Sequence, residues 1–140
     1  MKTVRDQQIE AVRRFNRFYT RQIGLLHEGL LDSAFSLSEV RLLYELAHRH
    51  NGMAKELAEE LGLDEGYLSR ILRTFKERGL IQRERSQSDG RQILLRLTDR
   101  GQKTFAPLNA RSREQAGGTL SKLSMANQNL LVEAIAPLRE

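Results

Sequence analysis

The sequence lacks cysteine and contains little proline. None of its 140 residues is a cysteine, and the two prolines are Pro107 and Pro137. A chain without thiols has no disulfide framework, no thiolate nucleophile and no cysteine-ligated zinc. Because proline interrupts the interior of helices, its scarcity favours a mainly helical chain.

Long apolar runs and catalytic motifs are missing too. No stretch approaches the roughly 20 apolar residues that span a bilayer, and the N-terminal stretch has no signal-peptide core. These absences predict a cytoplasmic protein with no membrane partner. The sequence has no glycine-rich phosphate loop, no G-x-S-x-G elbow and no spaced carboxylate pair. The three histidines are His27, His48 and His50, and their spacing is not that of metal ligands. We therefore expect no enzyme, no metal and no cofactor.

The chain does contain charge, and enough apolar residues for one core. Hydrophobic residues make up 39% and charged residues 29% of the chain, which is typical of a globular domain. The length predicts a single domain over residues 1–140. The net charge of +5 permits an acidic partner without naming one. Residues 64–97 hold eight Lys/Arg and five Asp/Glu, so +3 of this charge lies there.

Residues 54–79 indicate two short helices joined by a tight turn. Gly62 can adopt the left-handed conformation that ends a helix, and Asp64 can cap the next helix. Small Ala58 suits a close approach of the two helices. The second helix has an apolar face of Leu68, Ile71, Leu72 and Phe75, and a polar face of Gly66, Tyr67, Arg70, Arg73 and Glu77. This pattern is typical of a helix-turn-helix, although spacing alone also fits an ordinary αα-hairpin.

A basic hairpin follows the two helices. Runs 81–86 and 92–97 flank the dipeptide Asp89-Gly90, which is a strong hairpin signal. Ile93, Leu95 and Leu97 alternate, so one face of the ribbon can pack on the helices. Arginines that stay available for solvent or phosphate are Arg83, Arg85, Arg91 and Arg96. A helix-turn-helix followed by a basic hairpin is a winged helix, which predicts a mainly α fold with a small β-hairpin wing.

The polar face of the second helix supplies candidate DNA-binding residues. A helix fits the major groove, and its N-terminal residues reach base edges. The candidates are Glu65, Gly66, Tyr67, Ser69, Arg70 and Arg73, with Lys76, Arg83 and Arg85 as weaker candidates for backbone contacts. We assign Arg70 and Arg73 to guanine edges or phosphates and Ser69 to a phosphate. The alternative is a solvated helix face.

The flanking segments predict further helices with unpartnered apolar stripes. Residues 4–28 form one long helix, ended by Gly29, with an apolar stripe of Val12, Phe15, Phe18, Tyr19, Ile23 and Leu26 and a surround of Arg13, Arg14, Arg17 and Arg21. A membrane-surface helix is the alternative to a domain helix here, and the wide stripe suits packing against a second subunit.

Capping signals place the remaining elements. Ser36 and Glu39 form a capping box for a helix that buries Val40, Leu43, Tyr44 and Ala47. A very short strand is expected at Gly52-Met53. Thr98 and Ser124 cap the last two helices, and Gly117-Gly118 should end or loosen the first of these.

The stretch ELAEELGLDEGYLSRILRTFKERGLIQRERSQSDGRQILLRLTDRG resembles the winged-helix core of the MarR family of bacterial transcription regulators. The specific marks are RTFKERGLI at the end of the second helix, the wing Asp89-Gly90-Arg91 and the exit LTDRG. The helix order of nearly the whole chain is also that of the family. The N-terminal run RRFNRFYTRQIGLLHEGLLDSAFSLSEVRLLYELAHR resembles the start of fusions that join such a regulator to an acetyltransferase.

The resemblance implies a homodimer that binds double-stranded DNA sequence-specifically and responds to a small-molecule effector. Residues 35–100 would form the DNA-binding core, and residues 1–30 and 101–140 the dimerisation helices. It implies that Arg91 enters the minor groove and that Asp89 orients it; a generic turn with an exposed arginine is the alternative. An effector pocket would lie between the dimerisation helices and the winged domain. Its candidate lining residues, each equally well a core residue, are Phe15, Tyr19, His27 and Tyr44.

A second class of function stays open from sequence. The winged helix could serve as a protein-interaction scaffold, or as the DNA-targeting half of a separated acetyltransferase fusion. The placement of Arg70, Arg73 and Arg91 separates the classes, because a scaffold does not need all three on one face.

Overall fold

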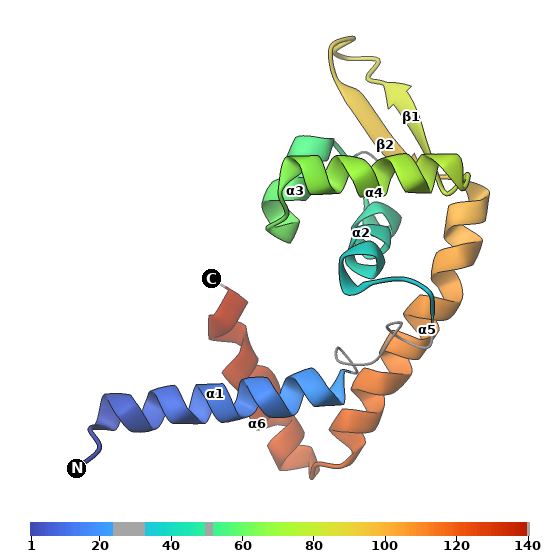
Figure 1. Cartoon of the computed structure of the whole chain (residues 1–140). Coiled ribbons are helices and arrows are strands. Elements are labelled where there is room, and N and C mark those ends of the chain that lie inside the picture. Colours follow the sequence, from blue (N-terminus) through green and yellow to red (C-terminus); the bar gives the residue numbers. More distant parts are fainter. Residues whose placement is uncertain (24–32, 50–51, 140) are drawn as a thin grey trace.

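The computed structural model describes residues 1–23, 33–49 and 52–139. In chain order the elements are α1 (Val4–Gln22), α2 (Leu37–His48), α3 (Ala54–Leu61), α4 (Glu65–Glu77), β1 (Ile81–Arg85), β2 (Ile93–Leu97), α5 (Asp99–Ser121), α6 (Met125–Ile135) and the 3-10 turn η2 (Ala136–Arg139). Figure 1 shows α2, α3, α4 and the hairpin gathered at one end, with α1 and α6 at the other. The helical fold with a two-stranded hairpin confirms the predicted class.

The helix-turn-helix forms around the predicted turn. Gly62 ends α3 with φ 64° and ψ 32°, a left-handed conformation that costs glycine little. The Asp64 carboxylate then accepts the backbone N–H of Tyr67 at 3.1 Å and caps α4. Gly79, with φ 73°, turns the chain from α4 into β1. These local signals fix where α3 ends and where α4 begins and ends.

The core lies between α2, α3, α4, the hairpin and the first half of α5. The predicted apolar face of α4 is buried, with Phe75 fully inaccessible. On α2 the prediction was partly wrong, because Tyr44 is 48% exposed while Leu42 and Leu46 are buried beside Leu43. Leucines dominate the core, and burying each contributes roughly 1.5–3 kcal/mol of transfer free energy.

The wing is an antiparallel pair whose inner end packs on the core. Ile81 pairs with Leu97 and Arg85 with Ile93. On the other edge of β2, Gly52 forms a single bridge to Leu95. The very short strand expected at Gly52-Met53 is thus reduced to one paired residue, and Met53 is not in a strand. The alternating face packs only at its inner end: Leu95 is buried, but Ile93 is 50% exposed because it lies on the outer part of the ribbon.

The helix α5 runs unbroken through Gly117 and Gly118, so the predicted break there was wrong. Two glycines weaken a helix by about 1 kcal/mol each relative to alanine. Contacts on both sides of them hold the helix: Gln115 Nε2 donates to Gln22 O at 3.2 Å, and Gln128 Nε2 donates to Leu120 O at 3.0 Å. Tertiary packing therefore overrides the local propensity.

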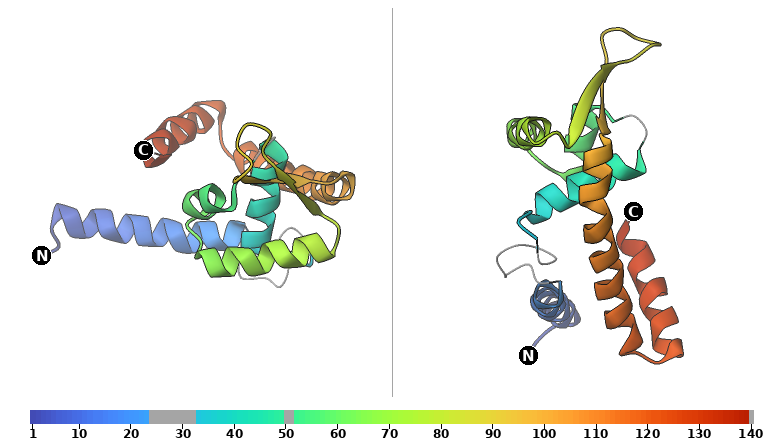
Figure 2. Two further views of the ribbon diagram at one scale, coloured as in Figure 1. Left: turned by 90° about the horizontal axis from the view of Figure 1, so that it is seen from above. Right: turned by 90° about the vertical axis from the view of Figure 1, so that its right-hand side faces the viewer.

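The helix α1 lies apart from the rest of the chain. It is N-capped by a Thr3–Asp6 capping box, and none of its 19 residues, all of them described, is buried. In the left view of Figure 2 it extends past the rest of the chain, and in the right view it is seen end-on below the winged helix. The predicted continuation to residue 28 and the break at Gly29 lie outside the described residues. No helix among the described residues has the length and apolarity needed to cross a bilayer.

Candidate nucleic-acid interface

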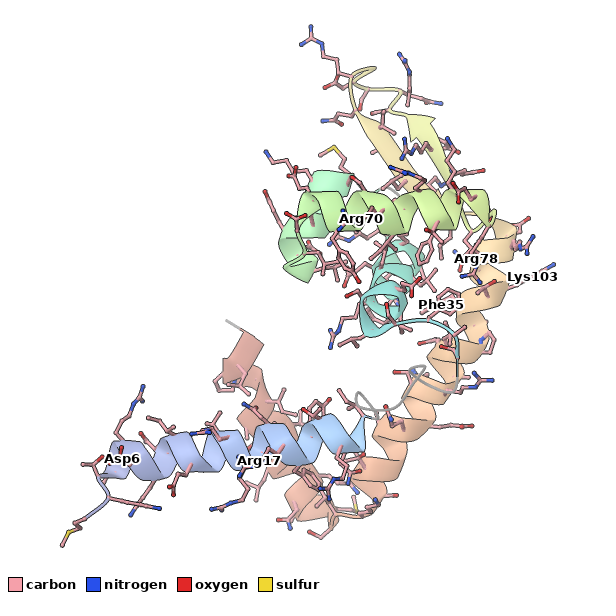
Figure 3. All side chains as sticks on the ribbon, in the orientation of Figure 1. Asp6, Arg17, Phe35, Arg70, Arg78 and Lys103 are labelled. Carbon is pink, nitrogen blue, oxygen red and sulfur yellow. The ribbon has the colours of Figure 1, made fainter. Side chains whose placement is uncertain are left out.

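The polar face of α4 is open to solvent along its whole length. Burial of Leu68, Ile71, Leu72 and Phe75 on the inner side turns the opposite side outward. The predicted contact residues on that outward side, Gly66, Tyr67, Ser69, Arg70, Arg73 and Lys76, are all exposed. Figure 3 places Arg70 on α4, at the end of the molecule that carries the wing. One face of α4 is thus packed on the core and the other is exposed, as an element that enters a DNA groove must be.

Tyr67 and Arg70 lie together at the start of this face. The Arg70 guanidinium carbon lies 5.8 Å from the centre of the Tyr67 ring. The Tyr67 backbone N–H is bonded to the Asp64 carboxylate, so the backbone that carries this ring is fixed in the first turn of α4. A methyl group at Gly66 would come within 3.1 Å of the Asp64 carboxylate. The absence of a side chain at position 66 therefore keeps both the cap and the first turn accessible.

The wing tip is a five-residue loop closed by the hydrogen bond from Ser86 N to Gln92 O at 2.9 Å. Within it, Gln92 N donates to Asp89 O at 3.0 Å, which makes a β-turn with Gly90 and Arg91 at its centre. Gly90 does not take the left-handed conformation of the tight Asp-Gly hairpin turn. The Asp89 carboxylate accepts the backbone N–H of Arg91 at 3.0 Å. Asp89 therefore shapes the turn that presents Arg91.

Charged residues along the wing divide into paired and unpaired groups. Arg96 Nη1 contacts Glu84 Oε2 at 3.3 Å, so this arginine is neutralised on the ribbon itself. Arg83, Arg85 and Arg91 are exposed, and no ion pair to them is recorded among the described residues. The sequence had left Arg96 available with the others. The ladder explains the difference, because the neighbouring strand brings Glu84 within reach of Arg96 only.

A cavity of about 530 Å³ opens between the winged domain and the two terminal helices. Two predicted lining residues, Tyr19 and Tyr44, border it, whereas Phe15 does not and stacks on Tyr19 at 5.4 Å. The fourth, His27, lies outside the described residues. The sequence analysis assigned no lining residues to the C-terminal helices, where the only signal was an apolar stripe. The lining residues there include Gln115, Ala116, Thr119, Leu120, Leu131, Val132 and Ile135.

The shifted pKa values lie away from this interface, on α1 and at the end of α2. The backbone and side chain of Thr3 lower the pKa of Asp6, and a hydrogen bond to Glu60 raises the pKa of Arg49. His48 Nδ1 contacts Tyr44 O at 2.8 Å, and its ring stacks on that tyrosine. Among the described residues no three His, Cys, Asp or Glu side chains gather as a metal site. His50 and His27 are outside that set.

Comparison with known proteins identifies this arrangement. Residues 35–93 match the model of the MarR family. The winged-helix part of the chain is therefore MarR-like. The organic hydroperoxide resistance transcriptional regulator of Bacillus subtilis is 43% identical over 59% of this chain, and the match spans only 56% of that relative.

Two solved structures extend the likeness over the whole chain. A probable transcriptional regulator from Pseudomonas aeruginosa is 25% identical, with a TM-score of 0.71 over 97% of this chain and 99% of that one. Streptococcus pneumoniae FabT, solved in complex with DNA, has a TM-score of 0.74 at 17% identity, over 98% of this chain and 95% of that one. Both the Bacillus subtilis relative and the Pseudomonas aeruginosa protein are named as transcriptional regulators.

Proposed function

We propose that this MarR-like chain is a homodimeric, sequence-specific regulator of transcription that binds double-stranded DNA in the cytoplasm. The observation that carries the proposal is the outward polar face of α4, with Arg70 and Arg73 exposed beside a projecting wing that carries Arg91. A helix of this kind reads base edges in the major groove. A wing tip with one unpaired arginine fits the narrow minor groove next to it.

The dimer follows from the exposed apolar surface at the other end. Phe15, Phe18 and Tyr19 on α1 are 47%, 54% and 48% exposed, and on α6 Leu130 and Val132 are 60% and 62% exposed. A contiguous apolar surface of this kind marks an interface. A 19-residue helix with little support of its own is also marginal in water. Residues 1–30 and 101–140 therefore serve as dimerisation helices and residues 35–100 as the DNA-binding core.

A small-molecule effector has a place to bind in this architecture. The cavity joins α1, α5 and α6 to α2, so a ligand within it contacts both the dimerisation helices and the DNA-binding core. Tyr19 and Tyr44 offer hydroxyl groups on a largely apolar wall. In the dimer, a ligand that prefers one arrangement of these helices changes the distance between the two α4 helices, and with it the affinity for DNA.

A binding selection on randomised duplexes tests this function. Two-fold symmetry sets the two α4 helices about one helical turn apart, so the selected sequence should be a pseudo-palindrome. The double variant Arg70→Ala, Arg73→Ala removes the predicted base contacts of α4 and serves as the control. If the wild-type chain enriches no sequence over this double variant, the proposal is wrong. A scaffold would bind duplexes no better with these arginines than without them.

A further inference from the structure

The charged face of α1 is a surface that DNA reading by α4 does not use. Four arginines lie within nine residues of this helix: Arg13, Arg14, Arg17 and Arg21. Positions 13, 17 and 21 follow each other at i, i+4 spacing, so these side chains form one row on the helix surface. All four are exposed. The row lies opposite the apolar stripe of Phe15, Phe18 and Tyr19, as the 3.6-residue period of a helix requires.

This row has almost no internal compensation. Like charges at i, i+4 destabilise a helix by a few tenths of a kcal/mol a pair. Glu10 is the acid within the patch, and its carboxylate is already taken by Lys2 Nζ at 2.7 Å. Among the described residues no ion pair to any of the four guanidinium groups is recorded. Glu10, Arg13, Arg14 and Arg17 border a hollow of about 320 Å³ on this helix.

The chemistry of the row fits phosphate. Arginine presents a rigid fork of N–H donors that binds phosphate oxygens in pairs, and every cation of the row is arginine. From Arg13 to Arg21 the helix rises about 12 Å. Along one strand of duplex DNA this length carries three to four phosphates, at about 3.4 Å of axis each. The row therefore matches a short segment of nucleic-acid backbone in charge and in length.

The position of the row decides which nucleic acid it contacts. Figure 3 shows Arg17 on α1 and Arg70 on α4 at opposite ends of the molecule, so one straight duplex held by α4 does not reach α1. A membrane surface would take up the apolar face of α1, which the proposed dimer already covers. Once α4 holds one site, other segments of the same DNA are present at high effective concentration.

We propose that the Arg13–Arg21 row of α1 binds the phosphate backbone of a second DNA duplex, so that one dimer bridges two DNA segments. The inference rests on the proposed function for the dimer and for the first contact through α4. The second contact is independent of sequence, because phosphates carry no base information. It is also strongly salt-dependent, since each neutralised phosphate releases counterions.

A capture experiment on the full chain tests the bridge. Short duplexes that carry the selected pseudo-palindrome are immobilised and saturated with protein at about 50 mM salt, where phosphate contacts are strong. A second, fluorescent random-sequence duplex is then added, and the amount retained is measured. We expect Arg13→Gln, Arg17→Gln and Arg21→Gln together to lower this amount about tenfold, with a salt slope shallower by about 0.9 per lost phosphate contact. Protein on the immobilised duplex should stay unchanged.

Matched variants separate the outcomes. Lys103→Gln, Arg113→Gln and Lys122→Gln together remove three exposed charges, two from α5 and one from the residue that follows it, and should leave capture unchanged. Replacing the three α1 arginines by lysine keeps the charge and should keep capture. The bridge is refuted if the glutamine variant captures as well as wild type, if the lysine variant loses capture, or if the glutamine variant is monomeric by light scattering.

The contact through α4 has its own readout in the same experiment, which is the amount of protein bound to the immobilised duplex. Arg70→Gln with Arg73→Gln should lower the protein bound to the immobilised duplex, so its failure to do so counts against the proposed function and not against the bridge. A parallel arm uses phosphatidylserine vesicles. If the α1 glutamine variant loses vesicle binding but keeps duplex capture, the row belongs to a membrane contact and the bridge is wrong.

Discussion

The arginines of α4 and the arginine at the wing tip are expected to recognise different features of DNA. In the proposed complex Arg70 and Arg73 face base edges, where a bidentate contact is worth about 1–3 kcal/mol of discrimination. Arg70→Ala or Arg73→Ala should therefore relax the preference at one defined base pair in each half-site. Arg91→Ala should weaken binding broadly and reduce the preference for A·T at the flanks, because the minor groove distinguishes little beyond A·T from G·C. Selection on randomised duplexes measures both effects.

Asp89 provides the finer control on the wing. Its carboxylate bonds the Arg91 backbone N–H, so Asp89→Ala should loosen the turn and resemble a milder Arg91→Ala. A change at a single central base pair after Arg91→Ala, with the flanks unaffected, would contradict the assignment of the wing.

Gly101 is the residue at which one added carbon should matter most for stability. A Cβ there would lie 2.1 Å from the backbone O of Leu80, at the joint where Thr98 Oγ1 also donates to Gly79 O at 2.5 Å. Gly101→Ala should cost about 1–3 kcal/mol or more, because the contacting atom is backbone and cannot move aside. The control is Gly118→Ala on the same helix, which has nothing within 4 Å and should gain about 0.5–1 kcal/mol. Urea unfolding of both variants measures these changes, and equal effects would exclude the packing explanation.

Single residues were predictable where the cause was local. Gly62, Asp64 and Thr98 act within a few positions of themselves, through backbone conformation and capping, and the structure confirms all three. The side of α2 that is buried depended on neighbours distant in sequence. Tyr44 therefore proved exposed and Leu42 buried. The close contact of Gly101 with Leu80 had no local sequence signal, because Gly101 stood out only as the last residue of the family-like exit LTDRG.

At the scale of elements, we expect α4 and the wing to make two kinds of DNA contact: contacts that recognise bases and contacts that attract phosphates. Lys76 at the end of α4 and Arg83 on β1 are exposed, and we expect them to contact phosphates rather than bases. Replacing either by alanine should weaken binding to all duplexes alike and make the slope of log K against log salt shallower by about 0.9. Titrations of a selected duplex and a scrambled one at several salt concentrations measure this. Arg96→Ala is the control, because Glu84 already neutralises Arg96.

Whole elements followed from the sequence more reliably than their ends and interruptions did. Periodicity and capping located the helix-turn-helix, and alternation located the hairpin. The Gly117-Gly118 break failed because contacts of Gln115 and Gln128 with other segments hold the helix together. Likewise the Asp89-Gly90 pair predicted a tight turn, whereas the wing closes through a longer loop. In each failure tertiary packing or loop length outweighed a dipeptide preference.

For the whole molecule, the decisive property is association of two copies. The apolar stripe of α1 lies in solvent in a single chain, and the exposed face of α6 adds to it. Covering Phe15, Phe18 and Tyr19 removes large aromatic areas from water at about 25 cal/mol per Å². Light scattering at micromolar concentration should therefore give twice the chain mass. Phe18→Asp places a charge in the covered stripe, so it should shift the chain toward monomer and weaken DNA binding, since each half-site is then bound alone. Gln87→Asp adds the same charge to the wing loop and should leave the mass unchanged. A wild-type chain that stays monomeric over the whole concentration range would refute the dimer, and the pseudo-palindromic site with it.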